Sequence, residues 1–465
     1  MPTQLTVAMK LRIHAEARRN FNQKATDLIQ LVRGASDQQQ SLKPYNSEVP
    51  VGSIIRDADI IGEIRMTTTD YRGRIVAREF WNDGAHFEIS EQNYLLFLQL
   101  AEKIQAQPEV FGMLSKQFVE ESLFHWVKVR HIDSNLTTSF MDFLDEEALG
   151  AVDKLTVWTP VSFLEVESAF SVASSEIRPI SRAIVSTWKQ QVLDMNPTTK
   201  SARDAPEIIR SFEVLMSRIQ GLAAVVTTIE AEPQRAKEWA REEAERVTSA
   251  LALFSKGAFL PDVKCVCRPK GMEHVSQSLA VLVSEGRFLT EEATVDLPSA
   301  GFWRLDNKEI ASMRSSILDK VSLLMQKRSP NAFEKSVLNS IFLYAKCAFT
   351  AEPVEKLVYV LSGLESVLLK NETEPIQQNL AERLAFFLKK GLDERKRVIK
   401  IVRGVYGMRS RYLHHGNSLS DLELMTDFLS IAWTFYFQLL VNVTKFQTKD
   451  DFICALDDVK LGGTS

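Results

Sequence analysis

Residues 398–416 read Val-Ile-Lys-Ile-Val-Arg-Gly-Val-Tyr-Gly-Met-Arg-Ser-Arg-Tyr-Leu-His-His-Gly, and this stretch decides the fold of the C-terminal third of the chain. Its apolar residues recur at spacings of three and four, the pattern of a helix with one buried face. These residues are Val398, Val402, Val405 and Tyr406. Glycine often ends a helix, so we expect this one to stop at Gly416. The stretch therefore predicts a helix that ends at a corner of a helical bundle.

One arginine and two histidines gather at the end of this helix: Arg409, His414 and His415. Arginine binds phosphate oxygens with a planar fork of donors, and histidine can move protons near neutral pH. These residue types suit a site that handles phosphates. They equally suit an ordinary helix end, where basic side chains meet the negative end of the helix dipole.

Helix geometry leaves two candidate pairs of side chains. At about 100° per residue, Arg409 and His414 point about 140° apart, whereas Arg411 and His415 are only about 40° apart. Either the helix ends before His414 and turns this ring inward, or Arg411 and His415 form the working pair. We predict Arg409 and His414, with His415 as the alternate.

The charge of the chain is distributed unevenly. Residues 389–411 carry nine basic and two acidic residues, a local charge of +7, which leaves −11 for the remainder of a chain whose net charge is −4. The acids are too few to pair these bases along a helix face, so we expect a surface for a polyanion such as RNA. The predicted RNA-binding residues are Lys396, Arg397, Lys400, Arg403 and Arg411.

Composition indicates a soluble, multidomain protein. With 465 residues, 45% hydrophobic and 25% charged, the chain is long enough for two or three domains. The apolar run 431–443 is too short and too polar to span a bilayer, and no secretion signal opens the chain. We therefore expect a cytoplasmic protein without membrane association.

Cysteine usage agrees with a reducing compartment. Four cysteines do not form a disulfide framework in a chain of this length. Cys265-Val266-Cys267 lies in an alternating, strand-like stretch and has no second Cys or His pair at zinc spacing. We expect a plain strand there, and no metal or cofactor.

The pattern of elements predicts an α+β protein in three parts. Residues 1–180 form a strand-rich mixed domain, with strands over 7–13, 64–87 and 155–180. Two helices are expected in this domain, one that starts at Ser90 and one over about 108–129. Residues 181–305 form an α/β middle segment. It has a connection over 181–205, a β-branched strand near 225–229, and a helix from Pro233 to Gly257.

Residues 306–465 predict an all-α bundle. Ser420-Asp421-Leu422-Glu423 resembles a capping box that starts the last helix. That helix is apolar on nearly every face from Phe428 to Val443, so it lies either at the centre of the bundle or against a partner subunit.

The C-terminal part resembles a HEPN domain. Val405–His414 contains Tyr-x-x-Arg-Ser-x-x-x-His, which fits the family's Arg-x(4–6)-His motif. Upstream, residues 357–368 and 380–385 are similar to the Apea-like HEPN subgroup. The resemblance covers about residues 306–460. The chain departs from the family in having two histidines before the glycine, where one is usual.

The resemblance implies a metal-independent endoribonuclease of an antiviral or toxin system, acting as a homodimer. The RNA 2′-OH would attack its own phosphate, with Arg409 neutralising charge on phosphorus, a histidine moving the proton, and Glu365 orienting the motif. Residues 1–180 would sense a phage-derived or other trigger. The alternative is a non-catalytic scaffold for dimerisation or RNA binding, with the aromatic last helix as the interface.

Overall fold

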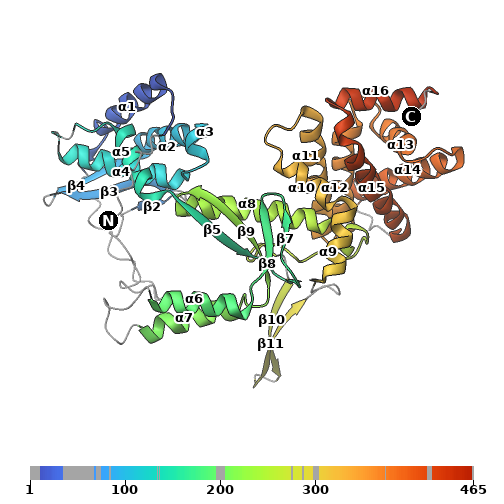
Figure 1. Cartoon of the computed structure of the whole chain (residues 1–465), viewed down its shortest axis with the longest axis horizontal. Helices are drawn as coiled ribbons and strands as arrows, with labels where there is room; N and C mark the ends of the chain where they lie inside the picture. Colours follow the sequence, from blue (N-terminus) through green and yellow to red (C-terminus); the bar gives the residue numbers. More distant parts are fainter. Residues whose placement is uncertain are drawn as a thin grey trace, which may run out of the picture. The chain divides into compact units, whose positions relative to one another are not determined.

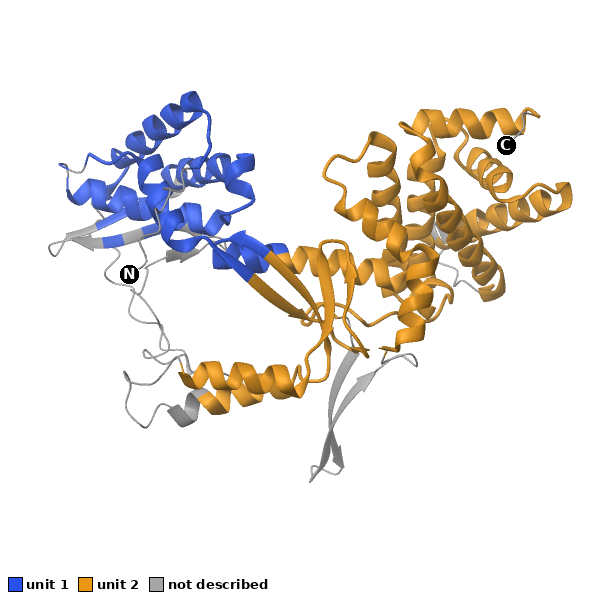
Figure 2. Ribbon diagram, viewed as in Figure 1, with its two compact units in different colours: residues 1–155, 229–239 blue, residues 156–228, 240–465 orange. Residues whose placement is uncertain are grey.

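The structure is a computed structural model of the whole chain (Figure 1). The residues that it describes are 11–34, 67–69, 75–82, 85–133, 135, 137–194, 205–273, 276–284, 287–296, 303–371, 373–415 and 421–462. They form a mixed α+β protein with a helical C-terminal region, as predicted. The chain divides into two compact units: residues 1–155 with 229–239, and residues 156–228 with 240–465 (Figure 2). The predicted boundaries at residues 180 and 305 stay predictions.

Unit 1 packs helices against a small antiparallel sheet. In the described residues, the sheet has the order β1-β4-β3-β2. Its helices bury a core that includes Phe97, Leu123 and Leu144. The helices are α1 (Ala15–Ile29), α2 (Glu91–Gln105), α3 (Pro108–Phe111), α4 (Lys116–Ile132) and α5 (Phe140–Ala151). The strands are β1 (Arg33–Gly34), β2 (Thr67–Thr69), β3 (Ile75–Asn82) and β4 (Ala85–Ser90).

The strands predicted over 64–87 are confirmed at residues 67–69, 75–82 and 85–87, and the rest of that range lies outside the described residues. The helix after Ser90 is confirmed. The strand predicted over 7–13 is wrong where it can be compared, because residues 11–14 have irregular backbone and residues 7–10 lie outside the described residues. Leu11 and Ile13 are nevertheless buried, and the Leu11 amide donates to Asp145 Oδ1 at 3.0 Å. Alternating burial thus arose here without strand pairing.

A second sheet, with the order β5-β9-β8-β7, belongs to unit 2 except for the start of β5 and the end of β9, which fall in unit 1. Unit 2 also contains a parallel pair of β6 with β12. The strands predicted over 155–180 are confirmed. The predicted connection over 181–205 is wrong in part, because helix α6 occupies residues 182–194. The strands are β5 (Asp153–Pro160), β6 (Leu164–Val166), β7 (Phe170–Val172), β8 (Ser175–Pro179), β9 (Ala223–Ala231) and β12 (Trp303–Leu305). The helices of this region are α6 (Arg182–Asp194), α7 (Ala205–Ser217) and α8 (Pro233–Ala252).

Two further segments precede the bundle. Strands β10 (Ser276–Ser284) and β11 (Arg287–Asp296) pair as an antiparallel hairpin. The strand predicted around Cys265-Val266-Cys267 is wrong: the backbone there is irregular, and both cysteines are buried. The Cys265 amide donates to the Ala348 carbonyl at 2.6 Å, so this segment is fixed by the bundle rather than by a sheet.

The C-terminal region is the predicted helical bundle, and α15 is its central helix. Helix α15 packs against α10, α11, α12, α13 and α14. The bundle helices are α9 (Asn307–Met313), α10 (Asp319–Gln326), α11 (Ala332–Lys346), α12 (Pro353–Leu368), α13 (Ile376–Leu388), α14 (Leu392–His415), α15 (Leu422–Asn442) and α16 (Lys449–Lys460). A π-helical turn, Arg314–Leu318, joins α9 to α10.

Helices α12 and α15 approach closely at Gly363. A β-carbon there would lie 2.5 Å from the Tyr436 hydroxyl oxygen, so the position requires glycine. Ser340 donates to the Gly363 carbonyl at 2.6 Å and contacts the Tyr436 hydroxyl at 2.8 Å. These contacts join α11 and α12 to the central helix α15.

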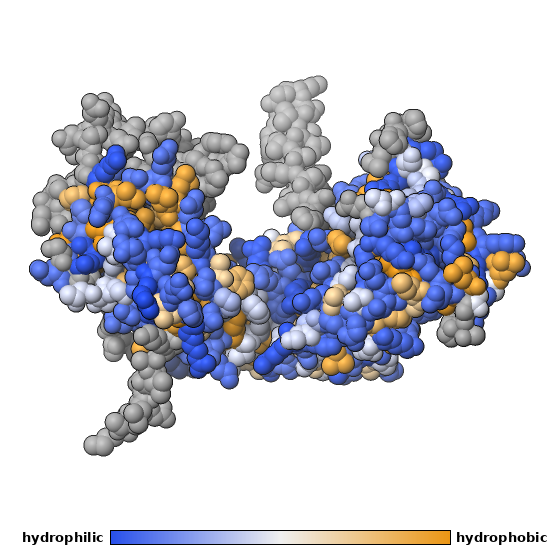
Figure 3. All heavy atoms as spheres, turned by 90° about the horizontal axis from the view of Figure 1, so that it is seen from above, coloured by the Kyte–Doolittle hydropathy of each residue, from blue (hydrophilic) through white to orange (hydrophobic). Residues whose placement is uncertain are grey.

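The start and the character of α15 differ from the prediction in detail. Asp421, not Ser420, is the N-cap, and its side chain accepts from the Leu424 amide. By length and composition alone, Leu422–Lys445 is apolar enough to cross a membrane. Its buried side chains, however, pack within the bundle core, as in a core helix. Most of the face drawn in Figure 3 is hydrophilic, with hydrophobic residues gathered only in patches.

Candidate functional site

Helix α14 carries the predicted motif and continues through His415. A helix that ends before His414 is therefore wrong. On an ideal helix the backbone positions of Arg409 and His414 are about 140° apart, and those of Arg411 and His415 about 40°. The side chains of His414 and His415 lie outside the described residues.

Arg409 lies beside Glu365, the acidic residue predicted to orient it. Their Nη1 and Oε1 atoms are 3.7 Å apart, and the side chains are 33% and 24% exposed. Tyr406 donates its hydroxyl hydrogen to the same Glu365 oxygen at 2.6 Å. Burial is the main cause that raises the pKa of Tyr406, and this hydrogen bond is the second. The hydroxyl therefore stays protonated and remains a donor. The structure thus brings Glu365, Tyr406 and Arg409 together.

The spacing of residues on two helices explains this meeting. Val402 and Val405 are fully buried, and Tyr406 and Arg409 follow them at spacings of three and four on the same side of α14. Glu365 lies at the edge of the buried face of α12. Arg409 Nε is buried and has no hydrogen-bond partner among the described residues. Arg409 is therefore held by one weak ion pair and keeps unused donor capacity.

A basic face lies on the opposite side of α14. We define the outer face as Lys396, Lys400, Arg403 and Arg411, which are all exposed. On an ideal helix they fall within a sector of about 80°. Among the described residues, Lys396, Lys400 and Arg411 form no ion pair within 4.0 Å. Like charges gathered without acidic partners attract anions, so binding of a polyanion to the outer face stays a prediction.

Gly407 interrupts the outer face. A β-carbon at Gly407 would meet only the Arg411 guanidinium, at 3.6 Å, within the described residues. Glycine inside a helix costs about 1 kcal/mol relative to alanine. Bare helix backbone is therefore partly exposed between Arg403 and Arg411, where a ligand can approach closely.

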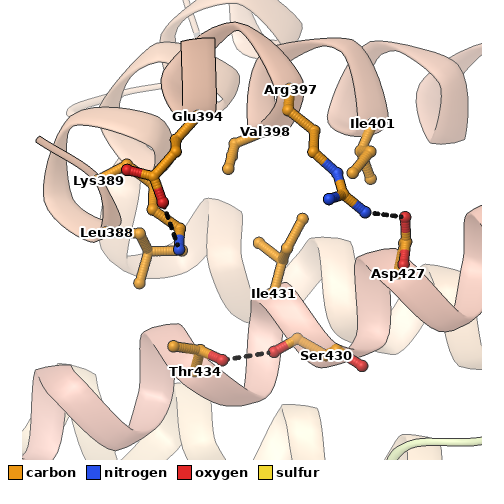
Figure 4. Close-up of a pocket in the computed structure, with 10 residues that line it drawn as sticks. All are labelled: Leu388, Lys389, Glu394, Arg397, Val398, Ile401, Asp427, Ser430, Ile431 and Thr434. Carbon is orange, nitrogen blue, oxygen red and sulfur yellow. Dashed lines mark hydrogen bonds and ion pairs between the residues drawn. The ribbon is translucent and has the colours of Figure 1, made fainter. Parts of the chain in front are cut away.

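Arg397 differs from the other predicted RNA-binding residues. Its guanidinium turns toward α15 and pairs with Asp427 at 3.2 Å (Figure 4). The Arg397 side chain is nevertheless 74% exposed. An exposed pair of this kind typically contributes only about 0–1 kcal/mol to stability, so Arg397 remains able to exchange its partner.

A pocket of about 250 Å³ lies between α14 and α15, beside Arg397. Figure 4 shows the apolar side chains of Val398 and Ile431 between two polar pairs, one at each end of the pocket. A second ion pair, Lys389 to Glu394 at 3.3 Å, borders it at the other end. The pocket is lined by Leu388, Lys389, Glu394, Arg397, Val398, Ile401, Asp427, Ser430, Ile431 and Thr434.

The α15 side of this pocket was missed from sequence, although a signal was present. Asp427, Ser430, Ile431 and Thr434 recur at spacings of three and four. They form a mostly polar row on a helix that was interpreted as apolar on nearly every face. No group of three or more His, Cys, Asp or Glu side chains in the described residues could hold a metal ion.

Two basic residues of the bundle are buried and belong to the core. Arg383 is 6% exposed and pairs with Glu374 at 2.9 Å and Asp457 at 3.1 Å. Lys356 is fully buried and donates to the carbonyls of Gly257 and Cys347. Both are engaged inside the protein and cannot reach a ligand.

No protein-family model, curated protein or solved structure matches this chain. Its function is therefore inferred from the residues of α14 and their neighbours.

Proposed function

We propose that this chain is a metal-independent endoribonuclease of the HEPN type, with its working residues at the end of α14. One observation carries the proposal: Arg409 lies 3.7 Å from Glu365, with an unpaired Nε, on the same helix as an exposed basic face. The outer face would hold the RNA backbone, because unpaired lysine and arginine side chains bind phosphates and release counterions.

The reaction needs no added nucleophile. The 2′-oxygen of the RNA forms a bond to the adjacent phosphorus, and the bond from phosphorus to the 5′-oxygen of the next nucleotide breaks. The products are a 2′,3′-cyclic phosphate and a 5′-hydroxyl. The 2′-OH proton leaves to a base, and the departing oxygen takes up a proton. Transfer by a placed histidine is worth roughly 10²–10⁴ in rate, and His414 or His415 would supply it.

Arg409 would stabilise the negative charge that develops on the phosphate oxygens. One well-placed donor of this kind contributes on the order of 10²–10³ in rate. Glu365 holds Arg409 only loosely, at 3.7 Å, so a phosphate can compete for the same guanidinium. Tyr406 fixes the carboxylate through its 2.6 Å hydrogen bond and thereby limits where Arg409 can go.

The HEPN resemblance extends this proposal to the biological setting. The chain would act in the cytoplasm as a homodimer and a toxin or antiviral effector. A phage-derived or other trigger would act on the N-terminal region. RNA is its substrate, and no membrane or cofactor takes part.

The test is cleavage of end-labelled RNA by purified protein in excess chelator. We expect 2′,3′-cyclic phosphate ends, and no cleavage of the same sequence in deoxy form, which lacks the 2′-OH. Arg409→Ala should reduce the rate by about 10²–10³. Lys335→Ala, on an exposed residue of α11, should leave it unchanged.

Separate replacement of the other three residues identifies the working pair. Loss with His414→Ala supports Arg409 and His414, whereas equal losses with Arg411→Ala and His415→Ala support the alternate pair. Cleavage unchanged by all four single substitutions would refute the proposed site. So would the absence of cleavage together with no toxicity on expression.

A non-catalytic RNA-binding scaffold is the second candidate, and one observation favours it. Because α14 continues through His415, the backbone positions of Arg409 and His414 lie on different sides of the helix. Helix α15, which the sequence predicted to be the last helix and which α16 follows, is a weaker candidate interface than the sequence suggested, since Trp433 donates to the Leu253 carbonyl of the same chain at 3.0 Å. RNA binding without turnover would identify the scaffold.

A further inference from the structure

We propose that the pocket between α14 and α15 takes one unstacked base of a single-stranded nucleic acid whose phosphates lie on the outer face of α14. This inference rests on the proposed function for the nature of the ligand. It adds a site for the base and a preference for unpaired strands, neither of which the Arg409 site provides.

The size of the pocket suits a single ring system. Its volume of about 250 Å³ falls just below the roughly 300–1,000 Å³ of pockets that enclose drug-sized ligands. Val398 and Ile401 are almost fully buried at its floor, and Ile431 is half-buried on the α15 side. These apolar groups favour the face of a flat heterocycle over a hydrated ion.

Polar groups of α15 line the same pocket and match the edge of a base. Asp427 accepts hydrogen bonds, so it can bind an exocyclic amino group. Ser430 is exposed and can donate or accept. Thr434 donates its own proton to the Ser430 carbonyl at 2.8 Å, which leaves its oxygen free to accept. An apolar floor with a few oriented polar groups is the usual composition of a ligand site.

Arg397 is placed to cover the inserted base. Its guanidinium is planar and 74% exposed, and it is held at the pocket by Asp427 at 3.2 Å (Figure 4). RNA-binding proteins stack unpaired bases on arginine planes as well as on aromatic rings. A ligand that bonds to Asp427 would release Arg397 for this stacking, because the exposed pair is weak.

The outer face supplies phosphate contacts at the right separation. Lys396 directly precedes Arg397, and Lys400 follows it by three residues, so both lie within one helical turn, about 5.4 Å, along the axis. A single nucleotide can therefore place its phosphate at these lysines and its base in the pocket. A duplex cannot, because its bases are stacked and paired.

Binding of a fluorescent single-stranded DNA tests this inference without any cleavage. We expect the wild type to bind the single strand more tightly than a duplex of equal length at the same salt concentration. Ile431→Trp, which fills the pocket, should weaken single-strand binding about tenfold and leave duplex binding unchanged. Arg397→Lys keeps the charge but loses the planar stack, and should weaken it about fivefold. Val441→Trp, exposed on the same helix outside the pocket, is the matched control.

The outcomes separate this inference from the proposed nuclease. Equal affinity for single and double strands, or no effect of both pocket substitutions, overturns the base pocket even if RNA is cleaved. Single-strand preference that depends on Arg397 and Ile431 supports the pocket even if no RNA is cleaved. Absence of binding to any nucleic acid overturns both.

Discussion

Two sets of basic residues in the helical bundle have opposite environments. Lys356 and Arg383 are buried, and each makes several hydrogen bonds inside the protein. Lys396 and Lys400 are exposed on α14 and have no ion-pair partner within 4.0 Å among the described residues. A buried cation must be satisfied within the fold, so it serves stability. An exposed cation without a partner costs the fold little and is free to bind a ligand.

Arg409 falls between these two sets. It is one-third exposed, with one ion pair at 3.7 Å and a buried Nε that lacks a partner among the described residues. A buried donor without a partner costs about 1–3 kcal/mol. A bound phosphate would remove this cost by accepting the unused hydrogen bond. This difference from Arg383, which is fully engaged, is the reason to place the proposed chemistry at Arg409.

The largest expected effect on the free energy of unfolding comes from replacing a buried basic residue. Arg383→Ala would leave Glu374 without its buried partner and Asp457 with only Lys370, so the free energy of unfolding should fall by about 3–5 kcal/mol. Arg397→Ala, which removes an exposed pair, should change it by less than about 1 kcal/mol. Urea denaturation measures both. Similar losses for the two variants would show that the buried and exposed basic residues do not differ in their contribution to stability.

A smaller loss is expected for Tyr406→Phe. This change removes only the 2.6 Å hydrogen bond to the Glu365 carboxylate and keeps the ring that packs on the core. Hydrogen bonds to charged groups contribute about 1.5–3 kcal/mol, and partial exposure places this one near 1.5 kcal/mol. Thermal unfolding measures the loss. Tyr359→Phe, on α12, is the control, because no hydrogen bond of its hydroxyl is present among the described residues. An equal loss in the control would contradict a special role for Tyr406.

Much of the bundle could be predicted from sequence because its signals are local. The apolar spacing of α12 and α14 fixes which face of each helix is buried, and Pro353 starts α12 at a position where proline is favoured. Lys356 falls on the buried side of α12, four residues before Val360. The sequence therefore shows a lysine among the apolar residues of this helix. Its carbonyl partners, Gly257 and Cys347, lie in other segments, so the sequence does not predict them.

Elsewhere the pattern and the structure diverged for physical reasons. The connection predicted over 181–205 overlaps α6, whose residues are amphipathic but none of them buried. Cys265, Val266 and Cys267 are all buried because an irregular segment packs into the bundle, so their burial does not follow the alternation of a strand. For the candidate site, the meeting of Glu365 with Arg409 followed from the resemblance. The hydrogen bond from Tyr406 to Glu365 could not be predicted from the sequence, and neither could the α15 side of the pocket. Both depend on how the helices pack against one another.

The titration of the buried Lys356 should make the stability of the protein depend on pH. Burial lowers the pKa of Lys356 from an ordinary value of 10.5 to about 8. The folded chain thus releases this proton near pH 8, whereas the unfolded chain keeps it, so stability rises with pH above 8. Between about pH 7.5 and pH 9 the rise should be about 1 kcal/mol. Burial raises the pKa of Cys347 to about 12, but this opposing loss begins only above the ordinary thiol value near 9.

The contribution of Lys356 to the pH dependence of stability is obtained by comparing the wild type with a variant that lacks this lysine. The pKa of Cys265 is lowered, chiefly by its hydrogen bond with Cys267, which adds a rise of the same sign. Denaturation of the wild type and Lys356→Met at each pH isolates the lysine, and the slope should be smaller in the variant. Parallel pH profiles would show that Lys356 does not titrate in this range.

The smallest effect on stability is expected for Lys396 and Lys400 of the outer face, whose replacement should clearly weaken RNA binding. Replacing both Lys396 and Lys400 by alanine should change the free energy of unfolding by no more than about 0.5 kcal/mol, because neither side chain has an ion-pair partner among the described residues. Affinity for single-stranded RNA should fall, and the slope of log K against log salt should decrease by about 0.7 for each phosphate that the protein no longer neutralises. Lys335→Ala with Lys346→Ala removes the same charge from exposed positions of α11 and should leave this slope unchanged. An equal change in both double variants would mean that overall charge, not the outer face of α14, attracts the RNA.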